Sequence, residues 1–153
     1  MAFPKLQQGQ FSMTSGNKTA IVTGGLSGMG LAIARRLAKD GTTVFVGTRS
    51  AGDKELVRDV LGADAGHIKA AALDVQSSDS VDAFVANVVA VRRDVDILVN
   101  AAGVYEEAAV IDHPDQIWED QIDINLSGTF RMIRAVMPHM KRAGWGRIIN
   151  IAS

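Results

Sequence analysis

The sequence predicts an α/β protein with a doubly wound parallel sheet of five strands in the order 3-2-1-4-5. Two observations support this prediction. Short apolar segments alternate along the chain with segments whose apolar residues recur at helical spacing. Glycines also stand where helices end and where the first strand turns into a helix. Since right-handed crossovers join parallel strands, this alternation gives that strand order.

The first half of the chain supplies three strands and two helices. The strands are expected in short apolar runs at residues 18–23, 43–47 and 67–75. The helices are expected at residues 28–40 and 53–61. Gly41 and Gly62 follow these two helices, in the position of C-terminal caps.

The second half supplies two strands and two further helices. Residues 79–92 place Val81, Phe84, Val85 and Val88 on one helical face. A strand is expected at residues 96–100, and one long helix from about 115 to 142, with Pro138 kinking its end. The last strand, residues 147–152, would lie at an edge of the sheet. We therefore expect the C-terminal part of the fold to be missing.

Composition excludes several classes of protein. The 153 residues carry a formal net charge of −1, so no basic surface favours nucleic acid and no polybasic segment favours anionic lipid. Cysteine is absent and the histidines are scattered, which argues against disulfides and metal sites. We find no secretory signal and no membrane-spanning run, and we expect a soluble cytoplasmic protein. Residues 1–17 are predicted to be a polar extension, and residues 18–153 one incomplete domain.

A glycine-rich turn lies between the first strand and the first helix. Its sequence, from residue 23, is Thr-Gly-Gly-Leu-Ser-Gly-Met-Gly. Glycine allows a sharp bend and a close backbone approach to a pyrophosphate, and the helix N-terminus offers free N–H groups. The expected contact residues are Gly24, Leu26, Ser27, Gly28, Met29 and Gly30. The alternative is a glycine-rich turn that binds no ligand.

Three further segments point to the same kind of site. Asn100-Ala101-Ala102-Gly103 ends the fourth strand with small residues, where a bulky side chain would block a ribose. Asp74 and Val75 end the third strand, beside the expected place of an adenine. Gly128, three residues after Asn125, costs about 1 kcal/mol in a helix relative to alanine. Something other than helix stability therefore selects Gly128.

Together these motifs resemble the short-chain dehydrogenase/reductase family from about residue 18 to residue 153, including its 3-oxoacyl-carrier-protein reductases. The resemblance implies a Rossmann-type fold, with Asp74 on the adenine side and Asn100, Ala101 and Gly103 near the cofactor. Ala101 stands where the family has a second asparagine, so only backbone contacts remain there.

The resemblance also implies catalytic residues. Asn125 matches the helix asparagine that anchors a water in the proton relay, and Ser153 matches the serine that bonds the substrate carbonyl. The alternatives are a helix-kink amide for Asn125 and a frayed terminal residue for Ser153. The family's Tyr-x-x-x-Lys pair has no counterpart, because the sole tyrosine, Tyr105, lies too early in the chain.

The end of the second strand bears on the choice of cofactor. An NAD enzyme presents a carboxylate there, whereas this chain has Thr48 followed by Arg49 and Ser50. A guanidinium pairs with a 2′-phosphate, so we expect NADP(H), with NAD less favoured. The alternative is a solvated arginine. Ser27 argues against NADP(H), since NADP(H) enzymes of this family often carry a basic residue at that position.

The sequence therefore predicts an oxidoreductase that exchanges hydride between NADP(H) and a carbonyl or alcohol. Residues 1–153 alone are expected to be inactive, and the full-length protein is expected to be a homodimer or homotetramer that pairs through the helix at 115–142. The alternative is a non-catalytic dinucleotide-binding or interaction module. A methyltransferase-like domain fits the glycine turn poorly. An open frame downstream that encodes Tyr-x-x-x-Lys would favour the enzyme.

Overall fold

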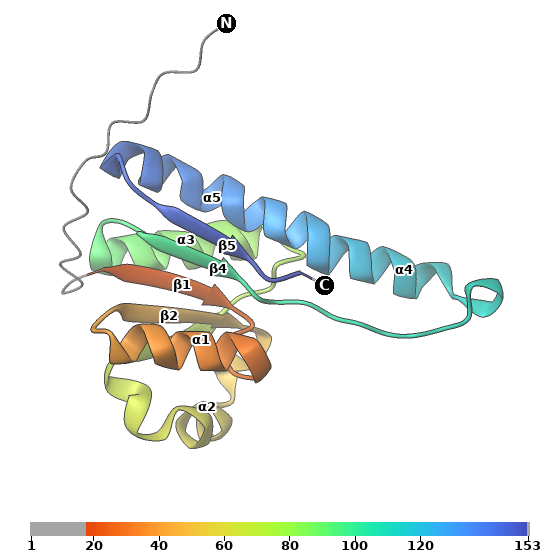
Figure 1. Ribbon diagram of the computed structural model, residues 1–153, viewed down its shortest axis with the longest axis horizontal. Helices are drawn as coiled ribbons and strands as arrows, with labels where there is room; N and C mark the ends of the chain where they lie inside the picture. The colour runs from red at the N-terminus through yellow and green to blue at the C-terminus, as the bar shows by residue number, and fades with distance from the viewer. Residues whose placement is uncertain (1–17, 153) are drawn as a thin grey trace, which may run out of the picture.

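A parallel sheet of five strands forms the centre of the molecule, in the order β3-β2-β1-β4-β5 (Figure 1). The computed structural model describes residues 18–152, so the predicted extension at residues 1–17 and Ser153 lie outside the described residues. The strands are β1 (Thr19–Thr23), β2 (Thr43–Thr48), β3 (Ile68–Ala72), β4 (Ile97–Asn100) and β5 (Arg147–Asn150). Every neighbouring pair is parallel, which confirms the predicted fold class and strand order.

Two strands end earlier than the sequence predicted. β3 ends at Ala72 rather than at residue 75, because its partner β2 leaves the sheet after Thr48. β5 ends at Asn150 rather than at residue 152, because β4 ends at Asn100 beside it. A strand makes ladder hydrogen bonds only as far as its neighbour runs alongside. The residues that follow are therefore free to line a site at this edge of the sheet.

Helices cover both faces of the sheet (Figure 1). The helices are α1 (Gly28–Lys39), α2 (Lys54–Leu61), α3 (Ser78–Arg92), α4 (Asp115–Ile122) and α5 (Gly128–Ala143). One core joins buried side chains of α3 and α5, such as Phe84 and Met132, to Leu98 of β4. The other joins α1 and α2 to Val22 and Val46. Burial of each such side chain contributes about 1.5–3 kcal/mol, so the two cores hold the sheet rigid beneath the site.

The predicted long helical segment at residues 115–142 runs without a break from Asp115 to Ala143, but its middle is not α-helical. α4 and α5 are joined by a π-helical turn, Asp123–Ser127, which widens the helix. Pro138 lies inside α5 and does not end it, since the helix continues to Ala143. Gly144 then ends the helix in the left-handed region, with φ of +69°. π-helical turns often occur at functional positions.

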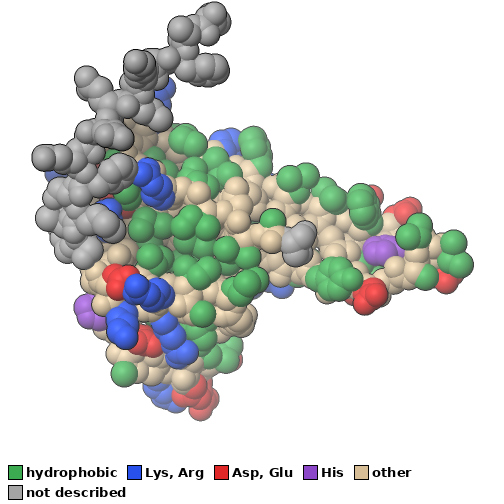
Figure 2. Space-filling view, in the orientation of Figure 1, with side chains coloured by type: hydrophobic (Ala, Val, Ile, Leu, Met, Phe, Trp, Pro, Cys, Tyr) green, Lys and Arg blue, Asp and Glu red, His purple; other side chains and the backbone are tan. Residues whose placement is uncertain are grey.

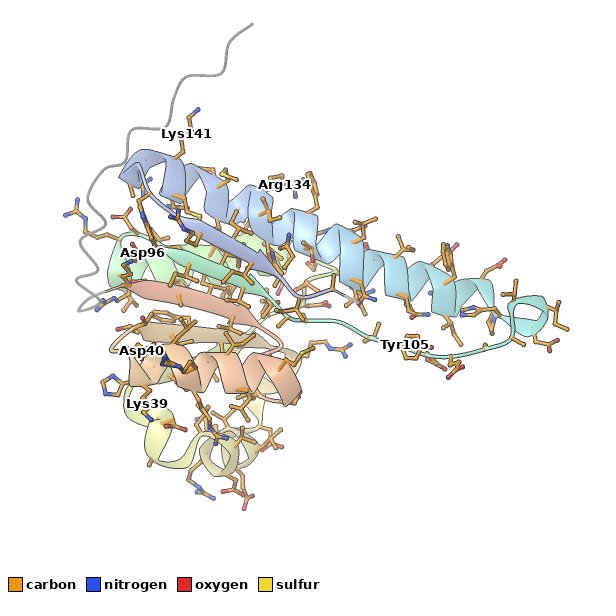
Figure 3. The ribbon with its side chains drawn as sticks, in the orientation of Figure 1. Lys39, Asp40, Asp96, Tyr105, Arg134 and Lys141 are labelled. Carbon is orange, nitrogen blue, oxygen red and sulfur yellow. The ribbon has the colours of Figure 1, made fainter. Side chains whose placement is uncertain are left out.

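An arm projects from the body of the molecule. The chain leaves β4, runs outward and returns as α4 (Figure 1). Tyr105, the single tyrosine, lies on this arm, where 81% of it is exposed (Figure 3). Val110 and Ile111 are also exposed there. Figure 2 shows hydrophobic side chains over the β5 region as well as along the arm, and Ile149 of β5 is 47% exposed. No helix among residues 18–152 is long and apolar enough to cross a membrane.

Candidate functional site

A pocket of about 190 Å³ lies where the strands end. It is lined by Gly24 after β1, by residues 47–50 at the end of β2, by residues 73–76 after β3, by residues 102–104 after β4, and by Ile124 of the π-helical turn. Ligands of open parallel sheets bind at the carboxyl ends of the strands, where neighbouring connections diverge. Of the predicted contact residues, the pocket brings together Gly24, Arg49, Ser50, Asp74, Val75 and Gly103.

The glycines of the turn after β1 have different roles. Gly24, with φ of +65°, lies so close to the next segment that a Cβ there would be 2.9 Å from the Cα of Ala102. A Cβ on Gly30 would be 2.5 Å from the carbonyl oxygen of Gly24. Both positions thus require glycine for packing. Gly28 differs, because its φ is +50° and a Cβ there would meet no atom within 4 Å. Gly28 therefore faces open space.

The N-terminus of α1 is suited to an anion. Ser27 is its N-cap residue but makes no side-chain capping hydrogen bond, and the first turn holds no acidic residue. By contrast, Asp53 caps α2 and Ser77 caps α3, each through its side chain. Unsatisfied N–H groups and the positive end of the helix dipole favour a negative ligand at α1. Met29, in the same turn, is 66% exposed.

Thr23 fixes this turn to the segment after β4. Its buried hydroxyl oxygen accepts hydrogen bonds from the backbone N–H groups of Ala101 (3.0 Å) and Ala102 (2.9 Å). The turn also bonds β2, because Gly24 donates its N–H to the carbonyl of Gly47 at 2.9 Å. Three strands are thus tied together at the floor of the pocket. Thr23 was not among the predicted site residues, although a threonine directly before the glycines was the available signal.

Thr23→Val is expected to lower the free energy of unfolding by about 2 kcal/mol, because a buried N–H group that loses its acceptor costs about 1–3 kcal/mol. Urea unfolding would measure the change. Thr42→Val is the matched control, since Thr42 is also buried but its hydroxyl bonds no described residue. Equal losses in the two variants would contradict the role of Thr23.

The end of β2 supplies a cation without a competing acid. Arg49 begins a 3-10 turn, Arg49–Gly52, and its side chain is exposed at the pocket. No carboxylate among the described residues forms an ion pair with Arg49. Thr48 occupies the position at the end of β2 where an NAD enzyme presents a carboxylate. It caps the turn, because its hydroxyl oxygen accepts from the N–H of Ser50 at 3.2 Å. Arg49 therefore places a cation at this corner of the pocket with no ion-pair partner among the described residues.

Asp74 and Gln76 form the wall after β3. The Asp74 carboxylate accepts from the N–H of Gln76 at 3.0 Å, and the Asp74 N–H donates to the hydroxyl of Ser80 at 2.9 Å. Val75 lies opposite Gly128 at the start of α5, where an added Cβ would be 2.8 Å from the Val75 side chain. This contact explains Gly128, since only glycine lets α5 approach the wall so closely.

The segment after β4 is partly buried beneath the pocket. Asn100 is 3% exposed, and its side-chain N–H donates to the Asn150 amide oxygen of β5 at 2.9 Å. The Asn100 amide oxygen has no partner among the described residues. Ala101 packs against the core beneath α1 and α2. Asn100 and Ala101 thus support the pocket from outside its lining.

Asn125 holds the base of the arm. Its amide oxygen accepts from the N–H of Val104 at 2.9 Å, and its amide N–H donates to the Val104 carbonyl at 2.8 Å. The Asn125 carbonyl accepts from the Thr129 hydroxyl at 2.9 Å. Val104 lines the pocket, so Asn125 is connected to the pocket through its hydrogen bonds to Val104. Tyr105 follows Val104 but does not line this pocket.

An ion pair lies behind the pocket, between the π-helical turn and α5. Arg131 donates to the Asp123 carboxylate at 2.7 Å, and both side chains are partly buried. The Arg131 hydrogen bond, followed by weaker contributions from Gln76 and Ser127, holds the pKa of Asp123 below its ordinary value despite some desolvation. Sequence reasoning missed this pair. No cluster of metal-ligating side chains occurs in residues 18–152.

Known proteins with similar sequences include dehydrogenases and reductases. A family profile described as short chain dehydrogenase matches residues 18–153. The chain is 41% identical over 138 residues to a D-beta-hydroxybutyrate dehydrogenase of Rhizobium meliloti. This match covers 89% of this chain and 54% of the relative. It is 38% identical over 138 residues to a 3-oxoacyl-[acyl-carrier-protein] reductase of Staphylococcus epidermidis. That match covers 90% of this chain and 57% of the relative.

A solved structure gives the same result. An actinorhodin polyketide ketoreductase variant, crystallised with NADPH, superposes with a TM-score of 0.82 at 41% identity, over 92% of this chain and 54% of that chain. The chain therefore spans about half the length of the curated relatives and the solved structure that it matches.

Proposed function

Because the chain belongs to the short-chain dehydrogenase family, we propose that its pocket binds NADP(H) and that the whole protein exchanges hydride between this cofactor and a carbonyl or alcohol. The uncapped N-terminus of α1, beside the open space at Gly28, carries this proposal. The matched relatives include a dehydrogenase and a reductase, which supports the reaction class.

The pocket fits the parts of a dinucleotide when it is taken together with the first turn of α1, whose residues do not line it. The first turn of α1 would take the pyrophosphate at its free N–H groups. Arg49 would pair with a 2′-phosphate through two parallel hydrogen bonds. Asp74 would accept from the amino group of an adenine that lies between Val75 and Ile124. A bound nicotinamide would supply the hydride, and the small residues Ala102 and Gly103 leave room for its ribose.

The chemical step also needs a proton donor and hydrogen bonds to the substrate oxygen, because reduction builds negative charge there. Ser153 would donate a hydrogen bond to that oxygen. Asn125 would act in the proton relay through its remaining side-chain amide hydrogen, or through its backbone carbonyl as an acceptor of a second hydrogen bond beside that from Thr129. Its amide oxygen and its other amide hydrogen bond Val104. Residues 1–153 contain no Tyr-x-x-x-Lys pair to complete this set.

A second copy of the chain is the proposed partner. Leu126 and Phe130 are 65% and 59% exposed on the π-helical turn and α5, and Trp118 of α4 is 61% exposed. Large apolar side chains grouped on one surface favour protein association. Sedimentation of the full-length protein would test a dimer or tetramer, and a monomer would contradict it.

Arg49→Asp is expected to weaken NADPH binding by roughly tenfold to a hundredfold, because a hydrogen-bonded charge pair is worth about 1.5–3 kcal/mol. NADH binding should improve, because a carboxylate accepts from the ribose 2′-hydroxyl. Calorimetric titration of the unchanged chain and the variant with both dinucleotides would measure this. Arg58→Asp on α2 is the control, since Arg58 has the same charge but does not line the pocket. An unchanged preference would refute the assignment of NADP(H).

A further inference from the structure

Arg131 connects three backbone and side-chain groups behind the pocket. Its guanidinium donates to the Val75 carbonyl at 3.2 Å, to the Asp123 carbonyl at 3.4 Å and to the Asp123 carboxylate at 2.7 Å. The Arg131 side chain is 20% exposed and that of Asp123 is 35% exposed. A planar guanidinium with several donors can hold such a set in one fixed geometry.

These bonds join two separate walls of the pocket. Val75 and Gln76 belong to the wall after β3, and Ile124, next to Asp123, belongs to the wall formed by the π-helical turn. Arg131 lies on α5, outside the pocket lining, and it contacts both walls. Without Arg131, the close packing of Gly128 on Val75 would remain, but no charged group would fix the two walls together.

Asp123 extends the connection. Its carboxylate accepts from Arg131 at 2.7 Å, and the polar side chains of Gln76 and Ser127 help Arg131 to hold the pKa of Asp123 below its ordinary value. Arg131 thus compensates the charge of this carboxylate while it bonds both walls.

We propose that Arg131 is a positioning residue that sets the distance between these two walls and thereby the selectivity of the pocket for adenine. The inference rests on the proposed dinucleotide binding. Arg131 holds Val75, and with it the neighbouring Asp74, at a fixed separation from Ile124. Asp74 can then accept from the amino group of adenine, which hypoxanthine lacks. A wider pocket would still bind the phosphates and the nicotinamide but would no longer distinguish the two bases.

The test compares NADPH with its hypoxanthine analogue, reduced nicotinamide hypoxanthine dinucleotide phosphate, by calorimetric titration. The unchanged chain should prefer NADPH by about tenfold, the size of one hydrogen bond to a charged group. In Arg131→Met the preference should fall to within about twofold. Arg131→Lys, which keeps the charge but loses the fork of donors, should retain part of it. Asp123→Asn should lower the preference in the same direction, which provides a second variant if Arg131→Met does not fold.

Arg134→Met is the matched control. Arg134 lies on the same helix, where it bonds the Ser78 hydroxyl at 3.1 Å and contacts neither wall of the pocket (Figure 3). Its loss should leave the base preference unchanged. A purely structural role for Arg131 would lower the melting temperature and weaken both dinucleotides equally, with the preference retained, and that result would overturn the inference.

Dinucleotide binding by the unchanged chain separates a failure of the proposed function from a failure of the role of Arg131. If the unchanged chain binds neither dinucleotide, the proposed function is wrong and the inference is overturned with it. If the unchanged chain prefers NADPH and the preference survives in Arg131→Met, or if it binds both equally, only the inference about Arg131 is overturned.

Discussion

Gly28→Val is expected to weaken dinucleotide binding by roughly a hundredfold, while the fold is kept. A Cβ at Gly28 meets no protein atom within 4 Å, so the added side chain would occupy the space proposed for the pyrophosphate. Loss of two hydrogen bonds to a charged group costs about 3 kcal/mol, which corresponds to that factor. Titration with NADPH would measure the affinity, and circular dichroism would measure the helix content.

Gly62→Val separates this effect from backbone strain. Gly62 also has a φ of +50° and open space around it, but it follows the last residue of α2 and is not part of the α1 N-terminus that is proposed to take the pyrophosphate. A side chain at positive φ is unfavourable at both positions, so the two variants should lose similar stability. Only Gly28→Val should lose binding. Equal binding by the two variants, or loss of fold and binding together in Gly28→Val, would favour a turn that has only a structural role.

Residues 1–153, purified alone, are expected to show no measurable reductase turnover. General acid–base assistance contributes about 10²–10⁴ in rate, and these residues lack the tyrosine that would donate the proton in the resembled family. The absent lysine would also hold the nicotinamide ribose, so the hydride would be less well oriented. An unactivated hydroxyl such as that of Ser153 is a poor acid near neutral pH.

The assay follows NADPH oxidation against a panel of ketones and acyl thioesters, with binding measured by calorimetry on the same preparation. Binding without turnover is the expected result. Turnover comparable to that of an intact reductase of the family, measured beside it, would show that other residues supply the proton.

The strand order could be predicted because it depends on features that are local in sequence. Each apolar strand is followed by a helix, and the handedness of the crossovers is nearly invariant. The residues at which the strands end were harder to predict from the sequence. β3 was predicted to reach Val75, but its end is set by the point at which β2 leaves the sheet, and that is a property of the partner strand.

The candidate site was predictable in part for the same reason. Gly24, Arg49, Asp74 and Gly103 each follow a strand, and the ends of parallel strands meet at one edge. Whether they bind as proposed stays a prediction. Arg131 could not be found in this way, because its bond to Val75 joins residues 56 positions apart.

The roles of individual glycines also required the structure. Sequence reasoning treated Gly28 and Gly30 alike, as positions that let a pyrophosphate approach. The structure distinguishes them, since Gly30 packs against Gly24 whereas Gly28 faces open space. The π-helical turn was likewise not predicted, because the apolar stripe of the surrounding helices continues through it.

The order of the strands has a consequence for synthesis on the ribosome. β1 lies in the middle of the sheet, and every later strand adds to an edge that already exists, so none has to be inserted. β2 and β3 can pair with the nascent sheet at once. The other edge of β1 stays open until β4 emerges, because Thr19 and its partner Asp96 are 77 positions apart. At about 5–20 residues per second this edge is unprotected for roughly 4–15 s. The two hydrogen bonds that Thr23 accepts can form only after β4 has emerged. They then join the two halves of the sheet into one unit.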